Sequence, residues 1–208
     1  MAQFEITETK MLLGPMLLCP LPERVYEQLT AYIRLLYRWN ERMNLTAVRD
    51  PEFLVGLHIA ECVRCAQRIP ETASTVLDFG SGAGLPGVPI QIVRPELAVT
   101  LAESQNKKAA FLREVLRELE LTNAAVSAKR VELLPADQTF DVVALRAVDN
   151  MGQALKDAGS RVGDRGCCMV LTSSAESPGV IATLPQLRWE SDPIPGTRQR
   201  VLLTGRKS

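Results

Sequence analysis

The sequence predicts an α/β fold, with a mostly parallel β-sheet covered by helices on both faces. Two observations predict it. From about residue 71 onward, short apolar runs alternate with helical stretches, and the last two apolar runs are separated only by a Pro-Gly turn. Alternating strands and helices form parallel sheets, because each connection crosses back over the sheet, whereas a short turn joins antiparallel strands. The 208 residues suffice for one domain with a small addition.

The first predicted helix runs from Pro22 to about Trp39. Its apolar residues follow the 3.6-residue period of an amphipathic helix, at Val25, Leu29, Ile33 and Leu36. Before it, Met11 to Leu21 is apolar but interrupted by prolines, and we expect this segment to pack on the protein. It is too short to span a bilayer and has no cleavage site of a secretory signal.

The second predicted helix starts at Asp50 and ends near Arg68. Asp50 is a natural N-cap, Pro51 suits the first helical position, and Glu52 lies in the first turn. Pro70 marks the following break. We therefore expect residues 1–70 to form a helical extension that packs on a core of residues 71–208.

Five apolar runs beyond residue 71 predict parallel strands, and one helix between them is especially clear. The runs are TVLDFG, AVTLAES, NAAVSAKR, FDVVALRAV and GCCMVLT, and the helix is KKAAFLREVLREL. Near the end of the chain, QLRWESDPI and RQRVLLTG are expected to pair antiparallel.

The composition is that of a soluble globular protein without an overall positive field. Lys plus Arg and Asp plus Glu number 24 each, so any nucleic acid has to be met by a local basic patch. We expect a cytoplasmic protein with no membrane partner. The five cysteines, an odd number, argue for free thiols. Cys62 and Cys65 form a CxxC near His58, but the motif lies within a predicted helix and has no second ligand pair, so we predict no metal site.

Glycines follow the first predicted strand in LDFGSGAGLPG, residues 77 to 87. They let the backbone approach a ligand closely at a helix N-terminus. Gly82, Gly84 and Gly87 match the GxGxxG dinucleotide pattern, which alone is a weak signal because several nucleotide-type ligands use the same turn. A P-loop is disfavoured because no GKS or GKT follows the glycines.

Asp78 helps to choose among these ligands. A carboxylate at the end of the strand repels a pyrophosphate by about 1 kcal/mol in water and by several times more in a less polar site. S-adenosylmethionine (SAM) has no phosphate and brings a sulfonium cation and an ammonium group, which Asp78 would attract directly or through water. Glu103 ends the next strand and is placed to accept hydrogen bonds from a ribose diol, a feature that NAD enzymes share.

Several longer segments of the sequence are more specific than the glycine loop alone. They are WNERMNLTAVRD, HIAE, LDFGSGAGLPGVPIQIVRPE, KKAAFLREV, KRVE and FDVVALRAV. Together they closely resemble the bacterial ribosomal RNA small subunit methyltransferase G family, also called glucose-inhibited division protein B. The resemblance covers the chain from about Pro22 to Thr172.

The resemblance implies the Rossmann-like fold of class I SAM-dependent methyltransferases and methylation of guanine N7 in 16S ribosomal RNA, with S-adenosylhomocysteine (SAH) as product. On matching positions, it implies that Gly80, Gly82 and Leu85 surround the donor's amino-acid and sulfonium portion and that Glu103 holds the ribose. Val131 and Glu132 would flank the adenine, and Arg146 would contact the donor or face the target base. Family members often have Asp where Glu103 stands, and Lys-Gly where this chain has Thr172-Ser173, which affects the expected contacts to the target nucleotide.

Guanine N7 has an exposed lone pair and no proton, so its methylation requires neither a general base nor a covalent nucleophile. Arg146 is therefore the single candidate for a catalytic role. The turn LRAV differs from the DPPY-like turn of enzymes that methylate exocyclic amines. Cytosine C5 methylation needs a thiol, for which Cys167 and Cys168 are the candidates, but small core residues are the simpler interpretation.

Local basic clusters are the candidates for RNA contact, since phosphate contacts supply most nucleic-acid affinity. They are Arg34, Arg38 and Arg42, then Arg49, then Lys107 and Lys108, and then the C-terminal Arg198, Arg200, Arg206 and Lys207. The expected partner is 16S ribosomal RNA or the small ribosomal subunit, met by a monomer. The alternatives are a methyltransferase acting on a small molecule or protein, a noncatalytic SAM-binding ribosome-assembly factor, and an NAD oxidoreductase.

Overall fold

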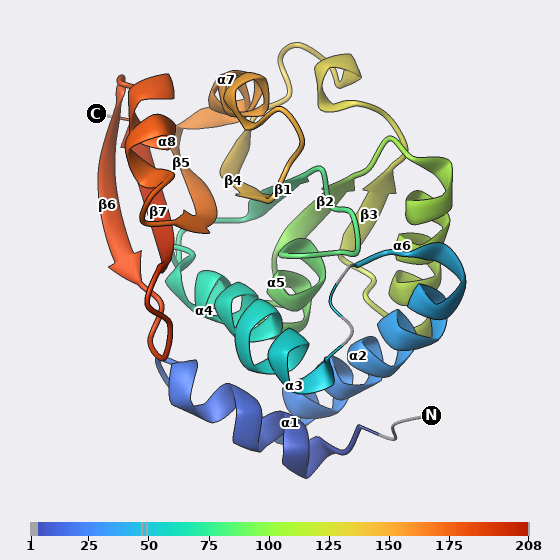
Figure 1. Cartoon of the computed structure of the whole chain (residues 1–208). Coiled ribbons are helices and arrows are strands. Elements are labelled where there is room, and N and C mark those ends of the chain that lie inside the picture. Colours follow the sequence, from blue (N-terminus) through green and yellow to red (C-terminus); the bar gives the residue numbers. More distant parts are fainter. Residues whose placement is uncertain (1–3, 47, 49, 208) are drawn as a thin grey trace.

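The computed structural model describes residues 4–46, 48 and 50–207, and its centre is a seven-stranded sheet with the strand order β3-β2-β1-β4-β5-β7-β6 (Figure 1). The strands are β1 (Thr75–Phe79), β2 (Ala98–Ala102), β3 (Ala124–Ser127), β4 (Phe140–Arg146), β5 (Val162–Ser173), β6 (Leu187–Pro193) and β7 (Arg200–Lys207). β1 to β5 are parallel. β7 runs antiparallel to both β5 and β6. The predicted mostly parallel sheet with an antiparallel C-terminal pair is confirmed.

Helices cover both faces of the sheet (Figure 1). α2 (Glu23–Met43), α4 (Ala60–Arg68), α5 (Gly87–Val93) and α6 (Asn106–Glu118) share one apolar core with one face, and α7 (Met151–Arg161) and α8 (Ser177–Thr183) share a second core with the other. Neighbouring residues of β1 show the alternation, because Val76 belongs to the first core and Leu77 to the second. This two-sided burial accounts for the continuous apolar runs in the sequence.

The N-terminal helices differ in detail from those that the sequence predicts. The chain also forms α1 (Ile6–Leu13) and the short 3-10 helix η1 (Gly14–Met16), where we expected only an apolar segment. The second predicted helix starts as expected, with Asp50 Oδ1 accepting from the backbone N–H of Glu52 at 3.1 Å. It comprises α3 (Pro51–Phe53), a π-helical segment η2 (Leu54–Ile59) and α4.

The N-terminal helices and the sheet form one continuous apolar core. Leu29, Tyr32, Ile33 and Leu36 of α2 are fully buried in the same cluster as Val76 and Val142 of the sheet. The division of the chain near residue 70 stays a prediction. None of the helices within the described residues is long and apolar enough to cross a membrane.

Candidate active site

A pocket of about 680 Å³ lies at the carboxyl ends of β1, β2 and β4, and we call it the donor pocket. This is the edge at which open parallel sheets bind ligands, and the volume lies in the usual range for small-molecule sites. Its lining includes Gly80, Gly82, Leu85, Glu103, Val131, Glu132 and Arg146, together with Leu45, Thr46, Lys108, Lys129 and Arg130.

The glycine loop after β1 forms one wall of the donor pocket. Gly80 and Gly82 have φ angles of +70° and +55°, a left-handed conformation that favours glycine. A Cβ atom on Gly80 would lie 3.3 Å from the Cγ1 atom of Val148, so even a methyl group would press on the opposite wall. The sequence places glycine here because both the turn and the closeness of the walls require it.

Glu103, at the end of β2, braces this loop and faces the pocket. Its Oε2 accepts from the backbone N–H of Gly82 at 2.9 Å, and its Oε1 accepts from that of Gln105 at 2.7 Å. The residue is only 6% exposed. Each carboxylate oxygen has a second lone pair, so Glu103 can still accept hydrogen bonds from a diol in the pocket.

Asp78 lies beneath the loop and not in the donor pocket, whose lining does not include it. It is fully buried, and its Oδ2 accepts from the backbone N–H of Gly87 at 3.0 Å at the start of α5. Burial raises the pKa of Asp78 to about 7, although hydrogen bonds from Ser81 and Gly87 oppose that rise. This placement corrects the role expected from the sequence. Asp78 joins β1 to α5, and Glu103 supplies a carboxylate that faces the donor pocket.

The 3-10 helix η3 (Val131–Leu133) forms another wall of the donor pocket through Val131 and Glu132. The buried Arg161, at the end of α7, holds this segment. Its guanidinium donates to the carbonyls of Val131 and Leu134 at 3.2 Å each, to that of Gln138 at 3.3 Å, and to that of Pro135. The segment that carries Val131 and Glu132 is thereby fixed to α7.

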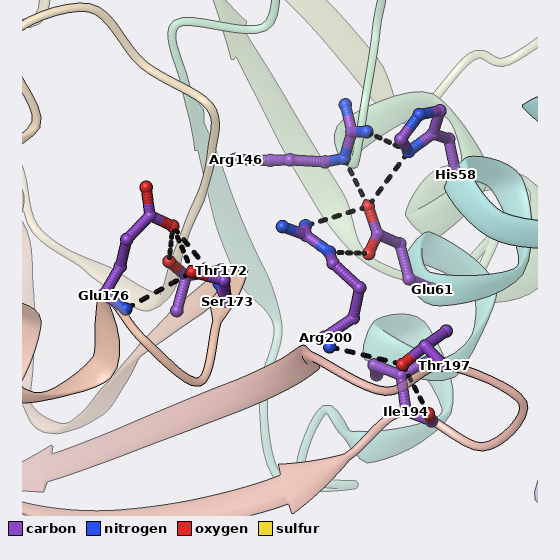
Figure 2. A network of polar contacts seen from close by, with 9 residues as sticks. All are labelled: His58, Glu61, Arg146, Thr172, Ser173, Glu176, Ile194, Thr197 and Arg200. Carbon is purple, nitrogen blue, oxygen red and sulfur yellow. Dashed lines mark hydrogen bonds and ion pairs between the residues drawn. The ribbon is translucent and has the colours of Figure 1, made fainter.

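Arg146, at the end of β4, belongs to a buried ionic network (Figure 2). Its Nε donates to Oε1 of Glu61 at 2.7 Å, and one of its terminal nitrogens contacts Nδ1 of His58. Arg200 of β7 binds the same carboxylate, through Nε to Oε2 at 2.9 Å and through a terminal nitrogen to Oε1 at 3.2 Å. Glu61 itself has no solvent exposure. Burial raises its pKa, but the hydrogen bond with His58 and the positive charges of Arg146 and Arg200 outweigh burial and lower the pKa to about 2. Glu61 is therefore a carboxylate at neutral pH.

Comparison with known proteins decides which family this site belongs to. The GidB family profile, described as rRNA small subunit methyltransferase G, matches residues 25–178. The chain is 43% identical over 145 residues to the ribosomal RNA small subunit methyltransferase G of Xanthomonas euvesicatoria pv. vesicatoria, a match that covers 66% of this chain and 68% of the relative. The chain belongs to the rRNA small subunit methyltransferase G family. The resemblance seen in the sequence is thus confirmed.

Solved structures agree with the methyltransferase fold. A SAM-dependent methyltransferase from Aquifex aeolicus superposes with a TM-score of 0.63 at 15% identity, covering 79% of this chain and 97% of that one. The N-methyltransferase NodS from Bradyrhizobium japonicum WM9, in complex with SAH, has a TM-score of 0.60 at 16% identity and covers 83% of this chain and 98% of that one. At such low identity these likenesses show the fold alone.

In this member of the methyltransferase G family, the predicted RNA-contact residues fall into separate regions. Arg38, Arg42 and Lys107 are exposed, and Lys108 lines the donor pocket. Arg34 donates to the backbone carbonyl of Phe4 at 2.7 Å and so also joins α2 to the chain preceding α1. Arg49 lies outside the described residues.

The C-terminal basic residues divide along β7. Arg198 is exposed just before the strand, and Arg200 is held by Glu61 near the carboxyl end of β5. Arg206 pairs with Glu190 at 3.0 Å, near the opposite end of the sheet. Lys207 lies 3.7 Å from Asp164 at that same end. Of these four residues, Arg200 is the one placed at the carboxyl edge of the sheet.

The four cysteines that are candidates for metal, redox or nucleophilic chemistry, Cys62, Cys65, Cys167 and Cys168, are buried. Cys167 and Cys168 lie within β5, between β4 and β7, and neither lines the donor pocket. Burial raises the pKa of the Cys167 thiol to about 11 and that of Cys168 further. Burial likewise raises the pKa values of Cys62 and Cys65 in α4. These thiols are core residues in this family member, without the low pKa that a nucleophile requires.

Sequence reasoning assigned no role to three residues that shape the site: Tyr32, Glu61 and Arg161. Tyr32 is fully buried, and its hydroxyl donates to the carbonyl of Ala83 in the glycine loop at 2.6 Å. Glu61 carries a recognisable signal, since it is an acid within the apolar run AECV and closes the HIAE motif. Tyr32 and Arg161 follow ordinary helical patterns, so only their long-range partners reveal what they do.

Proposed function

We propose that this chain is a SAM-dependent methyltransferase that transfers a methyl group to N7 of a guanine in 16S ribosomal RNA. Membership of the methyltransferase G family supports the substrate class. The observation that carries the proposal is the donor pocket itself, in which the glycine loop, Glu103 and the Val131–Glu132 segment converge at the carboxyl edge of the sheet.

The residues present fit SAM. The narrow wall of Gly80 and Gly82 suits its amino-acid and sulfonium portion, Glu103 suits the ribose diol, and Val131 offers an apolar surface for the adenine. Leu85, Glu132 and Arg146 complete the set of proposed binding residues. When bound, SAM supplies a methyl group: the N7 lone pair forms the new N–C bond, the C–S bond breaks, and its electron pair stays on sulfur.

The chain's own residues act by positioning and by excluding water. Leu85 is 6% exposed and Val131 is 3% exposed, so these two side chains add buried apolar surface to a pocket that is otherwise largely polar. Nδ1 of His58 contacts a terminal nitrogen of Arg146 and lies 3.5 Å from Oε1 of Glu61. His58 thus orients Arg146, and no proton needs to leave the nucleophile.

A methylation map tests the proposal. N7-methylguanosine in 16S ribosomal RNA is mapped in cells with and without the gene, and purified protein is then assayed on the undermethylated subunits. We expect one site to be lost in the cells and restored in the assay. Methyl transfer to a metabolite or protein pool alone, or tight binding of NADH with no heat from SAH in calorimetry, would contradict the proposal. Sedimentation tests the further expectation that a cytoplasmic monomer meets the subunit.

A further inference from the structure

A second cavity, of about 630 Å³, adjoins the donor pocket and has no role so far. Its lining comes from the carboxyl end of β5 and from α7 and α8, and includes Met151, Leu155, Leu171, Glu176, Val180 and Arg200. Ala147 and Val148, in the short loop after β4, line both cavities, so the two cavities meet at this loop. A group in the second cavity is therefore a direct neighbour of the donor.

The loop after β4 that meets both cavities has an unusual backbone conformation. Ala147 and Asn150 have φ angles of +49° and +51°, a left-handed conformation that residues other than glycine seldom adopt. Such outliers concentrate where function requires a particular geometry. The Val148 side chain packs toward Gly80 on the donor side.

The second cavity combines apolar residues with the hydrogen-bonded carboxylate of Glu176, which is an exposed residue. Oε2 of Glu176 accepts from Thr172 Oγ1 at 2.8 Å, from Ser173 Oγ at 2.9 Å and from the Ser173 backbone N–H at 3.2 Å. These bonds lower the pKa of Glu176, the one from Thr172 most. Oε1 accepts no hydrogen bond from the described residues, and Figure 2 shows it pointing away from the three contacts. Thr172 and Ser173 thus aim a charged acceptor while leaving half of it available.

Arg200 lowers the pKa of Glu176 through its positive charge, but its guanidinium is held elsewhere. Its guanidinium is held by Glu61 on the other side, and no ion pair joins Arg200 to Glu176 within the part of the chain that the structure describes (Figure 2). By binding Arg200, Glu61 therefore keeps this cation from pairing with Glu176 in the second cavity. A ligand there meets a free acceptor on one side and a cation on the other.

We propose that the second cavity is the acceptor-base pocket, and that Oε1 of Glu176 selects guanine by accepting from both its N1–H and its N2 amino group. This inference rests on the proposed function. Guanine alone among the four bases presents two adjacent donors on its Watson–Crick edge, whereas adenine, cytosine and uracil mix donors with acceptors there. N7 lies on the opposite edge of the ring, so a guanine held by Glu176 turns N7 toward the Ala147–Val148 loop and the donor. The ring becomes positive when N7 is methylated, so these hydrogen bonds strengthen toward the transition state.

The test removes one donor from the substrate. The mapped guanosine is replaced by inosine, which lacks the 2-amino group, in whichever RNA or subunit the wild-type protein methylates. Because a hydrogen bond to a charged group is lost, kcat/KM is expected to fall about 10- to 100-fold for the wild-type protein. Glu176→Ala is expected to lower kcat/KM on guanosine by a similar factor and to discriminate less than about threefold between the two substrates. Glu71→Ala, a change of an exposed glutamate outside both cavities, is the matched control and is expected to behave as wild type.

A blocking variant tests the location independently. Nothing lies within 4 Å of a Cβ built on Gly179, which lines the second cavity, so Gly179→Phe fills that space without a clash at Cβ. It is expected to reduce methylation at least 100-fold while SAH affinity by calorimetry stays within about threefold. Unchanged methylation by Gly179→Phe, or equal guanosine-to-inosine ratios in wild type and Glu176→Ala, would overturn the acceptor pocket. No methylation of any RNA by the wild-type protein would instead refute the proposed function, and this inference with it.

Discussion

Glu61 is a single buried carboxylate that holds two arginines from distant strands. Removing its charge leaves Arg146 and Arg200 without their partner, and breaking a buried ion pair in this way typically costs about 3–5 kcal/mol. We expect Glu61→Gln to lower the free energy of unfolding by about that amount in urea at pH 7. Glu114→Gln, which affects an exposed pair with Arg117, should cost less than about 1 kcal/mol.

The same residue predicts an acid sensitivity. The pKa of Glu61 falls from 4.5 to about 2 on folding, so its stabilising contribution is complete above pH 4.5 and is lost as the pH drops toward 2. Stability curves of wild type and Glu61→Gln should therefore converge between pH 4.5 and 2. Parallel curves over that window would contradict the prediction.

The pKa of Asp78 shifts in the opposite direction to that of Glu61. Its folded-state pKa of about 7 lies above the ordinary value of 3.8, so the folded protein holds this proton more tightly. Stability attributable to Asp78 is present at low pH and declines as the pH rises from about 4 to about 7. Because Asn keeps an acceptor for the Gly87 N–H but carries no charge, Asp78→Asn should be more stable than wild type at pH 8 by about 1–4 kcal/mol. Thermal unfolding at pH 5 and pH 8 measures this, and an equal gap at both values would refute it.

The contact between β1, β2 and α5 depends on Gly87 having no side chain. A Cβ there would lie 2.3 Å from Leu101 Cδ2 and 2.5 Å from Asp78 Oδ2, so α5 would have to move. We expect Gly87→Ala to destabilise the protein by about 1–3 kcal/mol, as overpacking does elsewhere. Gly14→Ala meets nothing within 4 Å and should leave the melting temperature nearly unchanged. Similar melting temperatures for the two variants would show that α5 adjusts freely.

Elements whose pattern is local were predictable from the sequence, and the rest were not. The apolar runs identify the five parallel strands, because strands buried on both faces show continuous apolar character. The Pro-Gly turn likewise identifies the pairing of β6 with β7. The π-helical segment Leu54–Ile59 carries the same periodicity as an ordinary helix, so nothing local reveals it.

In the candidate site, too, local patterns were predictable from the sequence and long-range contacts were not. Residues that end strands or form the glycine loop were placed correctly at the pocket edge, since the parallel sheet brings strand ends together. Asp78 was misjudged because side chains alternate along β1 and its own faces α5. The anchoring of Arg146 and of the Val131–Glu132 segment depends on residues 85 and 30 positions away, respectively, which a linear reading does not connect.

The distribution of charge over the whole molecule predicts where RNA approaches. α2 ends just before Leu45 and Thr46, which line the donor pocket, and carries the exposed Arg38 and Arg42. We expect the double change Arg38→Ala with Arg42→Ala to weaken RNA binding and to reduce the slope of log affinity against log salt by about 1–2, with SAH affinity unchanged.

Arg206→Ala is the control, because Arg206 lies near the opposite end of the sheet. It should alter neither RNA affinity nor salt dependence. Equal effects of the two changes in filter binding across a salt series would show that RNA does not approach along α2.

The hydroxyl of Tyr32 donates a hydrogen bond to the carbonyl of Ala83, a residue 51 positions further along the chain. The helix that carries Tyr32 therefore cannot be removed without affecting the glycine loop, which we propose holds the donor, because a hydroxyl from outside the sheet supports that loop. Exchanging the first forty residues for those of another enzyme would therefore replace the basic surface of α2 and also remove a contact that supports the donor pocket.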